Sequence, residues 1–284
     1  MRRPAKRPRD AAAGRIGQNA PDIWEHRMGD YRVTARNFSE ASENRIHSDD
    51  IARRYGFRGA LVPGVAVYGY LTRPLVERFG ADWLGASASA VRFHKPAYEG
   101  DELSVRLAEA GDDAWTATCT NADGTLLAEL TTRPGEVPPA RNQAAFAGAA
   151  KPPERVDMNW DTVVAGQPFT PWHWQITEDG NRTYAQQVFD DLAVYRTAAH
   201  PHWLLHIANR ALTREFVMPA WIHVGSEIVF RELLKVGDTV EVRAVPLEKW
   251  ERKGHQFVKL YLAYVRGETV TTEIIHTAIF RVAE

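Results

Sequence analysis

The sequence contains one internal repeat, and this repeat constrains the fold more than any other feature. The segment Ser89-Ala-Val-Arg-Phe93, followed by Gly100-Asp101, recurs as Ser226-Glu-Ile-Val-Phe230, followed by Gly237-Asp238, at a constant offset of 137 residues. Both copies alternate apolar and polar residues, as half-buried strands do. Each Gly-Asp pair falls where the chain is expected to turn. The chain therefore contains two copies of one folding unit.

Each copy also predicts a helix followed by a meander of strands. Apolar helices are predicted over 64–79 and 201–216, and their first residues are again 137 apart. Further strands are predicted over 114–121 and 125–132 in the first copy, and over 256–265 and 269–282 in the second. An antiparallel sheet around one long apolar helix is an α+β fold. Two tandem copies predict a fused pseudo-dimer.

The 284 residues leave room for two domains. We expect a disordered basic tail over 1–23, an N-terminal domain over 24–133, a Pro/Ala-rich linker over 134–160 and a C-terminal domain over 161–284.

Composition excludes several classes of protein. Lys and Arg total 35 and Asp and Glu total 36, so the strong positive field of a general nucleic-acid binder is missing. No apolar run is long enough for a transmembrane helix, and no apolar stretch typical of a signal peptide follows the basic start. The single cysteine, Cys119, excludes an intramolecular disulfide and fits a reducing compartment. A cytoplasmic location is therefore expected.

Chemically useful residues concentrate in residues 42–64. Asn44 and His47 lie on a predicted loop, and Gly64 begins the first long helix. The free N–H groups at a helix N-terminus bind anions, or a carbonyl oxygen that is becoming negative. A histidine upstream of such donors indicates proton transfer beside a polarised carbonyl.

This segment resembles the hydratase motif of the MaoC-like, R-specific enoyl-CoA hydratases, a family of hotdog folds. The motif runs Asp-x-Asn-Pro-Ile/Leu-His-x-Asp, then an Ala in a short helix, then a hydrophobic-His-Gly before the central helix. The matching residues are Asn44, Ile46, His47, Asp49, Ala52, Val62 and Gly64. The resemblance covers nearly all of 24–133, and the second copy resembles the family in layout. It implies a tandem (double) hotdog fold.

The motif departs from the family where the family has its catalytic Asp, because that position is Ser42 here. Serine is not an effective base near neutral pH, so the neighbouring Glu43 becomes a candidate. In the second copy, residues 188–195 place Asp190 at the Asp position and Tyr195 at the His position. Asp190 and Tyr195 are expected to shape the acyl pocket or the pseudo-dimer interface.

The resemblance implies an acyl-thioester hydro-lyase of the enoyl-CoA hydratase or 3-hydroxyacyl-CoA dehydratase type, within fatty acid metabolism. His47 would exchange the proton, Asn44 would orient water or substrate, and Glu43, or a water held by Ser42, would replace the missing Asp. Backbone near Gly64, with Pro63 and Val62, would bind the thioester oxygen. The thioester supplies the activation, so no cofactor is expected.

Two alternatives stay open. A hotdog acyl-CoA thioesterase would use the same donors, with Glu43 or His47 activating water. A non-catalytic acyl-thioester binding protein is favoured by Ser42. The expected partner is a small-molecule acyl thioester of CoA or a carrier protein, with no nucleic acid and no membrane, and the expected state is a monomer or homodimer. His202 and His206 are spaced as metal ligands can be, but no Glu follows His202 and no Cys is near, so no metal is expected.

Overall fold

The computed structural model describes residues 30–141 and 154–283. The predicted tail, 1–23, and part of the predicted linker lie outside the described residues. No helix in the described ranges is long and apolar enough to cross a membrane.

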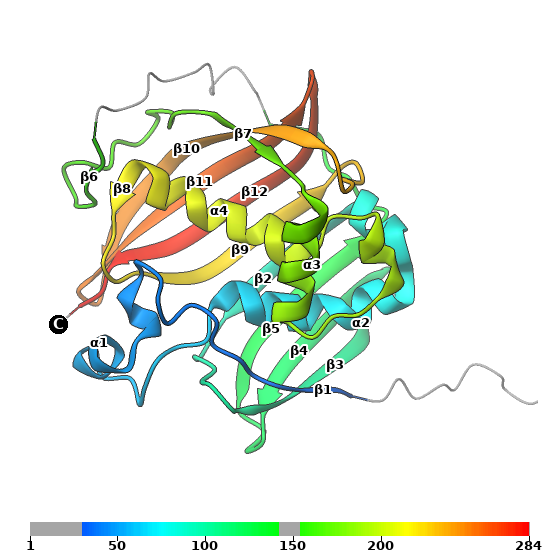
Figure 1. The fold of residues 1–284 in the computed structure, drawn as a ribbon, viewed down its shortest axis with the longest axis horizontal. Coiled ribbons are helices and arrows are strands. Elements are labelled where there is room, and N and C mark those ends of the chain that lie inside the picture. The colour runs from blue at the N-terminus through cyan, green and yellow to red at the C-terminus, as the bar shows by residue number, and fades with distance from the viewer. Residues whose placement is uncertain (1–29, 142–153, 284) are drawn as a thin grey trace, which may run out of the picture.

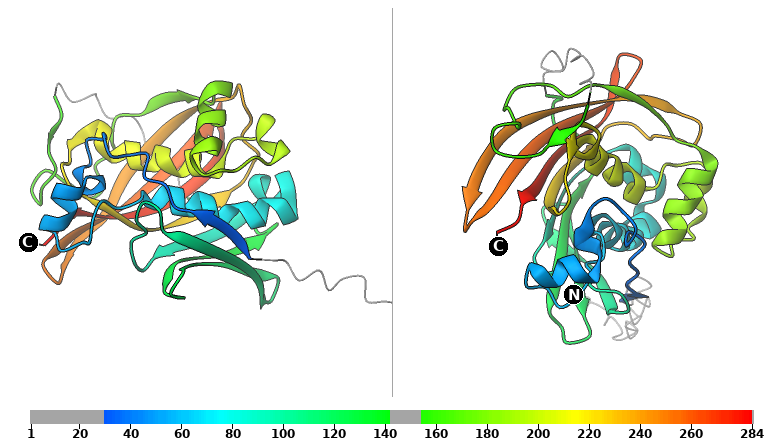
Figure 2. Two further views of the ribbon diagram at one scale, coloured as in Figure 1. Left: turned by 60° about the horizontal axis from the view of Figure 1, so that its bottom comes forward. Right: turned by 60° about the vertical axis from the view of Figure 1, so that its left-hand side comes forward.

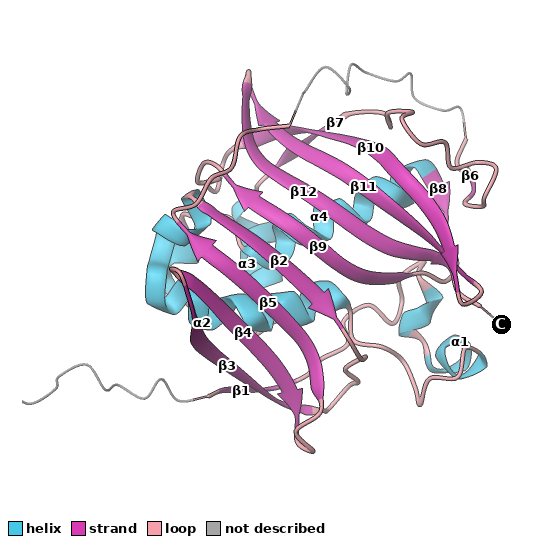
Figure 3. Cartoon of the chain, turned by 180° about the vertical axis from the view of Figure 1, so that it is seen from behind, coloured by secondary structure: helices cyan, strands magenta, loops and turns pink. Residues whose placement is uncertain are grey.

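One antiparallel sheet dominates the molecule and runs through both halves (Figures 1 and 3). Its strands lie in the order β1-β3-β4-β5-β2-β9-β12-β11-β10-β7. The first half contributes β1 (Tyr31–Thr34), β2 (Ser87–Phe93), β3 (Glu102–Gly111), β4 (Ala114–Asn121) and β5 (Leu126–Pro134). The second contributes β7 (Trp172–Gln175), β9 (Ile222–Phe230), β10 (Thr239–Arg252), β11 (His255–Arg266) and β12 (Thr269–Arg281). Two short strands, β6 (Val156–Asp157) and β8 (Phe216–Val217), pair in parallel apart from this sheet.

The two halves join through strands that carry the sequence repeat. β2 pairs antiparallel with β9, and Ala90 lies opposite Glu227. Those two residues are themselves 137 apart, so equivalent positions of the two copies face each other at the centre of the junction. An interface in which the same element of each copy pairs with itself is that of a two-fold dimer. The predicted pseudo-dimer is thus the observed arrangement.

Two long helices lie in contact on the concave side of the curved sheet (Figure 2). They are α2 (Gly64–Gly85) and α4 (Pro201–Glu215). α2 buries almost every residue of its first three turns, and such a helix can only lie in a core. Its helical geometry breaks at Gly80, which has φ +61°. Glycine adopts this conformation without a Cβ clash, so the break falls directly after the predicted end at Phe79.

Smaller helices form the connections in front of α2 and α4. A 3-10 turn (Arg45–His47) and α1 (Asp49–Arg54) precede α2, while α3 (Glu178–Gln187) and a 3-10 turn (Ala193–Arg196) precede α4. α1 contains Ala52, the residue that matches the Ala in the short helix of the family's motif.

A buried ion pair ties α2 to the second half. Arg73 of α2 donates to Asp190 at 3.1 Å and to Asp191 at 2.8 Å. The Asp190 side chain has no exposure, and its other oxygen lies 3.3 Å from Nε2 of His200. Asp190 therefore lies at the pseudo-dimer interface.

Replacing Arg73 by methionine should lower the free energy of unfolding by about 3 kcal/mol, because it leaves a buried carboxylate without its cationic partner. Urea unfolding measures the loss. Asp191→Asn is the matched control: it removes the other, 86% exposed partner of Arg73 and should leave stability unchanged. Equal losses in the two variants would contradict this account.

Candidate functional site

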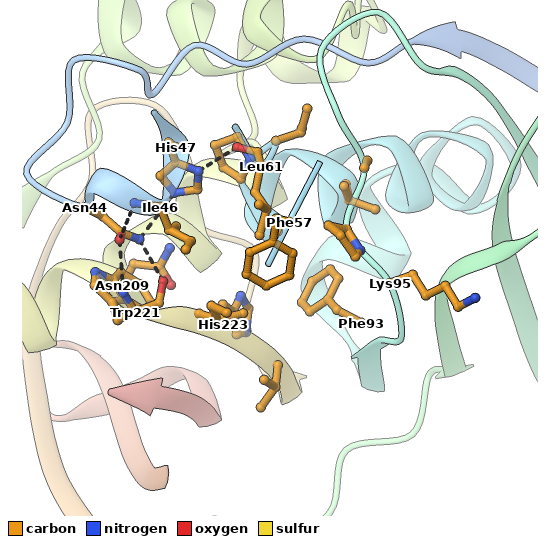
Figure 4. A pocket seen from close by; sticks show the side chains of 18 of the residues that line it. Asn44, Ile46, His47, Phe57, Leu61, Phe93, Lys95, Asn209, Trp221 and His223 are labelled. Atoms are coloured by element: carbon orange, nitrogen blue, oxygen red, sulfur yellow. Dashed lines mark hydrogen bonds between the residues drawn. The ribbon is translucent and has the colours of Figure 1, made fainter. Parts of the chain in front are cut away.

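An apolar pocket opens where the N-terminus of α2 meets the start of β9 (Figure 4). Its walls come from both halves of the chain. The first half supplies Asn44, Ile46, His47, Phe57, residues 61–64, Val67 and residues 93–97, and the second supplies Asn209 and residues 221–224. The pocket therefore exists only when the two halves are joined.

The 3-10 turn that carries His47 is fixed to the second half by Asn44. The Asn44 side chain caps this turn by accepting from the Ile46 N–H. Its Oδ1 also accepts from the Trp221 N–H at 3.1 Å, and its Nδ2 donates to the Trp221 carbonyl at 3.0 Å. The remaining Nδ2 hydrogen faces Nε2 of His47 at 3.3 Å. Both hydrogens and the oxygen of the Asn44 amide have partners, so Asn44 positions His47 and binds the two halves together.

The protonation state of His47 follows from its partners. Nδ1 lies 2.7 Å from the Leu61 carbonyl oxygen, which can only accept, so Nδ1 carries the proton. Nε2 then carries the lone pair, whose partner within the described chain is the long contact with the Asn44 amide at 3.3 Å. Burial lowers the pKa of His47, and the bond to Leu61 only partly opposes this. His47 is therefore a neutral imidazole with its basic nitrogen at the pocket.

The N-terminus of α2 presents free donors to the same space. Val62 donates to the Ala97 carbonyl at 2.9 Å, and Pro63 has no N–H. The Gly64 and Val65 N–H groups have no acceptor within the described chain, and Gly64 lines the pocket. Of the three residues predicted to bind an oxyanion, only Gly64 has a donor to spare in the described chain. Val65 has a second free N–H at the same helix end, but it is not among the residues that line the pocket.

The other predicted residues of the motif lie outside the pocket. Ser42 donates its hydroxyl to the Asn44 carbonyl at 3.2 Å. Glu43 is exposed and forms a two-bond ion pair with Arg155, at 2.8 and 3.0 Å, which lowers the pKa of the carboxyl. Neither Ser42 nor Glu43 contacts His47 among the described residues.

The sequence matches no protein-family model and no curated protein. Solved structures do resemble the fold. A conserved hypothetical protein from Mycobacterium tuberculosis, described as having a double hotdog fold, superposes with a TM-score of 0.58 at 14% identity, over 88% of this chain and 93% of its own. The chain has a double hotdog fold.

Two further solved structures are similar at the same low identity. A MaoC-like dehydratase aligns with a TM-score of 0.55 and 14% identity, over 88% of this chain and 97% of its own. A putative MaoC domain protein dehydratase from Chloroflexus aurantiacus aligns with a TM-score of 0.54 and 14% identity, over 88% and 93%. The fold class predicted from the repeat and the motif is confirmed.

The two candidate residues of the second hotdog half lie away from the pocket. Asp190 is held by Arg73 and His200, and Tyr195 is buried with its ring centroid 4.2 Å from that of His200. Neither Asp190 nor Tyr195 lines the pocket. Over the described ranges, no group of three or more His, Cys, Asp or Glu side chains is placed to hold a metal ion.

Sequence reasoning missed the contribution of the second half to the pocket. Trp221, directly before β9, lines it beside Asn44, to which it is hydrogen-bonded, and His223, in β9, lines it on the side away from His47 (Figure 4). One signal was present in the repeat: His223 stands at the position of Ala86 in the first copy. A histidine that replaces alanine next to a predicted strand is a candidate for a polar role.

Proposed function

We propose that the protein is an acyl-thioester hydro-lyase, of the enoyl-CoA hydratase or 3-hydroxyacyl-CoA dehydratase type. The observation that carries this proposal is the N–H group of Gly64, which has no acceptor among the described residues and lies in one apolar pocket with the neutral His47. The next N–H group of the helix, on Val65, also has no acceptor in that part of the chain. The apolar walls suit an acyl chain, and the donors suit the thioester oxygen.

The residues support a short reaction sequence. Water bound at Nε2 of His47 loses a proton to that nitrogen as its oxygen bonds to the β-carbon of the enoyl group. The electron pair of the double bond moves toward the thioester carbonyl, whose oxygen takes up negative charge. Gly64 and Val65 stabilise that charge. The protonated His47 then returns its proton to the α-carbon, so the net change is the addition of one water.

Asn44 has a positioning role in this scheme. Nε2 of His47 has one lone pair, which faces the Asn44 amide at 3.3 Å. The attacking water must displace the Asn44 amide from this lone pair. The hydrogen bonds between Asn44 and Trp221 keep the turn in place meanwhile. Hydrogen bonds of this kind are commonly loose before the substrate binds.

A second candidate is an acyl-thioester binding protein without turnover. The observation in its favour is that none of the described residues lining the pocket is Asp or Glu. The position of the family's catalytic Asp is Ser42, whose hydroxyl is bonded to backbone.

The decisive assay follows the enoyl-thioester absorbance of crotonyl-CoA and longer enoyl-CoA substrates in the presence of the protein. Loss of that absorbance without thiol release is the expected result. Thiol release from saturated acyl-CoA would indicate a thioesterase instead. Calorimetric binding of butyryl-CoA with no turnover of any substrate would leave the binding protein as the function.

A further inference from the structure

His223 brings an unused nitrogen to the N-terminus of α2. The residue is 7% exposed, and its Nδ1 has no hydrogen-bond partner among residues 30–141 and 154–283. A Cβ placed on Gly64 would lie 3.6 Å from this Nδ1, so the nitrogen adjoins the backbone that offers the free donors. Figure 4 shows His223 on the floor of the pocket, on the opposite side from His47.

A β-bulge turns His223 inward. Along β9, the buried residues Ser226, Ile228 and Phe230 alternate regularly toward the core. The pairing with β12 slips between Gly225 and His223, which leaves Val224 unpaired and reverses the alternation. Bulges often re-aim a side chain in this way next to a functional site.

The other ring nitrogen of His223 begins a buried chain of polar groups. Nε2 lies 2.8 Å from Oγ of Ser226, and that oxygen lies 3.1 Å from Nδ1 of His276. His276 is fully buried, and its Nε2 has no partner. Ser226 has one hydroxyl proton, so it donates to one histidine and accepts from the other.

Two proton arrangements satisfy this chain, and burial distinguishes them. Either His276 donates to Ser226 and Ser226 donates to His223, or both bonds run the other way. The second arrangement leaves an N–H group of His276 orphaned in the dry interior, which is rare in proteins. The first leaves only a lone pair there and places the N–H of His223 at the pocket, where a ligand or water can accept it.

Both histidines stay neutral. Burial, reinforced by the nearby ring of His276 and only partly opposed by the Gly225 backbone, lowers the pKa of His223 well below its ordinary value. Burial lowers the pKa of His276 to about 3. The positive end of α2 also disfavours a charged imidazole at this place. A neutral histidine beside a helix N-terminus polarises a carbonyl in the same manner in triosephosphate isomerase.

We propose that His223, held with its proton on Nδ1 by Ser226 and His276, donates a third hydrogen bond to the thioester oxygen beside Gly64 and Val65. This inference rests on the proposed function, since it requires an acyl thioester in the pocket. It makes the second hotdog half a direct contributor to the chemistry, through a residue that lies outside the hydratase-like motif.

The test uses the full chain and butyryl-CoA labelled with carbon-13 at the thioester carbonyl, which binds without reacting. Infrared difference spectroscopy measures the carbonyl stretch, which moves to lower wavenumber when the oxygen accepts hydrogen bonds. His223→Phe keeps a ring against Phe93, whose centroid lies 4.8 Å from that of His223, but removes the donor. Ser226→Ala breaks the chain while leaving His223 in place. Ser89→Ala is the matched control, because Ser89 is the repeat equivalent of Ser226 and is bonded to Thr132 away from the pocket.

In the unmodified protein the band should lie well below its position in free butyryl-CoA. In His223→Phe and in Ser226→Ala the band should move part of the way toward its position in free butyryl-CoA. In Ser89→Ala it should not move. With crotonyl-CoA, loss of one such donor should lower kcat about 10²–10³-fold with KM nearly unchanged.

A band that is the same in the unmodified protein and in both site variants, with butyryl-CoA still bound, would overturn the role of His223 and leave the proposed function standing. Failure of the unmodified protein to bind butyryl-CoA would refute the proposed function, and this inference with it.

Discussion

Replacing His47 by alanine should lower the rate of enoyl-thioester hydration by about 10²–10⁴-fold, the usual worth of a general base. His47 is the only residue of the hydratase-like motif that brings a basic lone pair to the pocket within the described chain, because Nδ1 is committed to the Leu61 carbonyl. Steady-state kinetics with crotonyl-CoA measures the loss. Circular dichroism checks that the fold is kept.

Glu43→Gln is the control for this prediction. The Glu43 carboxylate is exposed and bound to Arg155, so its loss should leave kcat within a factor of a few of the unmodified value. If Glu43→Gln abolishes hydration while His47→Ala does not, the base has been assigned to the wrong residue.

The second large predicted effect is a loss of stability at acidic pH. The free energy of unfolding should fall steeply between pH 6.5 and pH 4, because burial lowers the pKa of several histidines in the folded protein. They are His47, His200, His202, His206, His223 and His276. In the unfolded chain these residues bind protons below about pH 6.5, whereas in the folded chain they stay neutral, so stability is full above that pH and is lost as the pH falls.

His206 and His276 set the scale of the loss, since burial lowers their pKa values to about 4 and about 3. At pH 5 each histidine lowers the free energy of unfolding by roughly 2 kcal/mol relative to neutral pH, and together they lower it by roughly 4 kcal/mol. That is a large share of the roughly 5–15 kcal/mol by which a domain is usually stable. Urea unfolding at pH 7.5 and pH 5.0 measures the difference. A His206→Phe variant should show a shallower pH dependence, and equal stability at the two pH values would contradict the prediction.

The repeat made most of the fold predictable. A constant offset of 137 residues located both long helices and predicted a pseudo-dimer, because an apolar helix and the strands that bury it form one unit in each copy. The start of α2 at Gly64 followed from the same logic. Local patterns of this kind are reliable because they report burial directly. The pairing of β2 with β9 that joins the halves was not predicted.

The site was less predictable, because three of its features depend on contacts between residues distant in the sequence. Glu43 lies outside the pocket through its bond to Arg155, 112 residues away. Asn44 is committed to Trp221, 177 residues away. His223 faces the pocket only because a bulge at Val224 reverses the strand, and strand alternation read from the sequence places it outward.

The joining of the two halves in one chain has a consequence for how such a protein can diversify. In a homodimer every substitution occurs twice, so both sites must keep the same chemistry. In this chain the copies have been free to specialise. One copy's motif region now lines a pocket, while the corresponding region of the other, around Asp190, forms a buried ion pair with Arg73 of the first copy. Each polypeptide should accordingly bind one acyl thioester, whereas a symmetric pair of single repeats would offer two places.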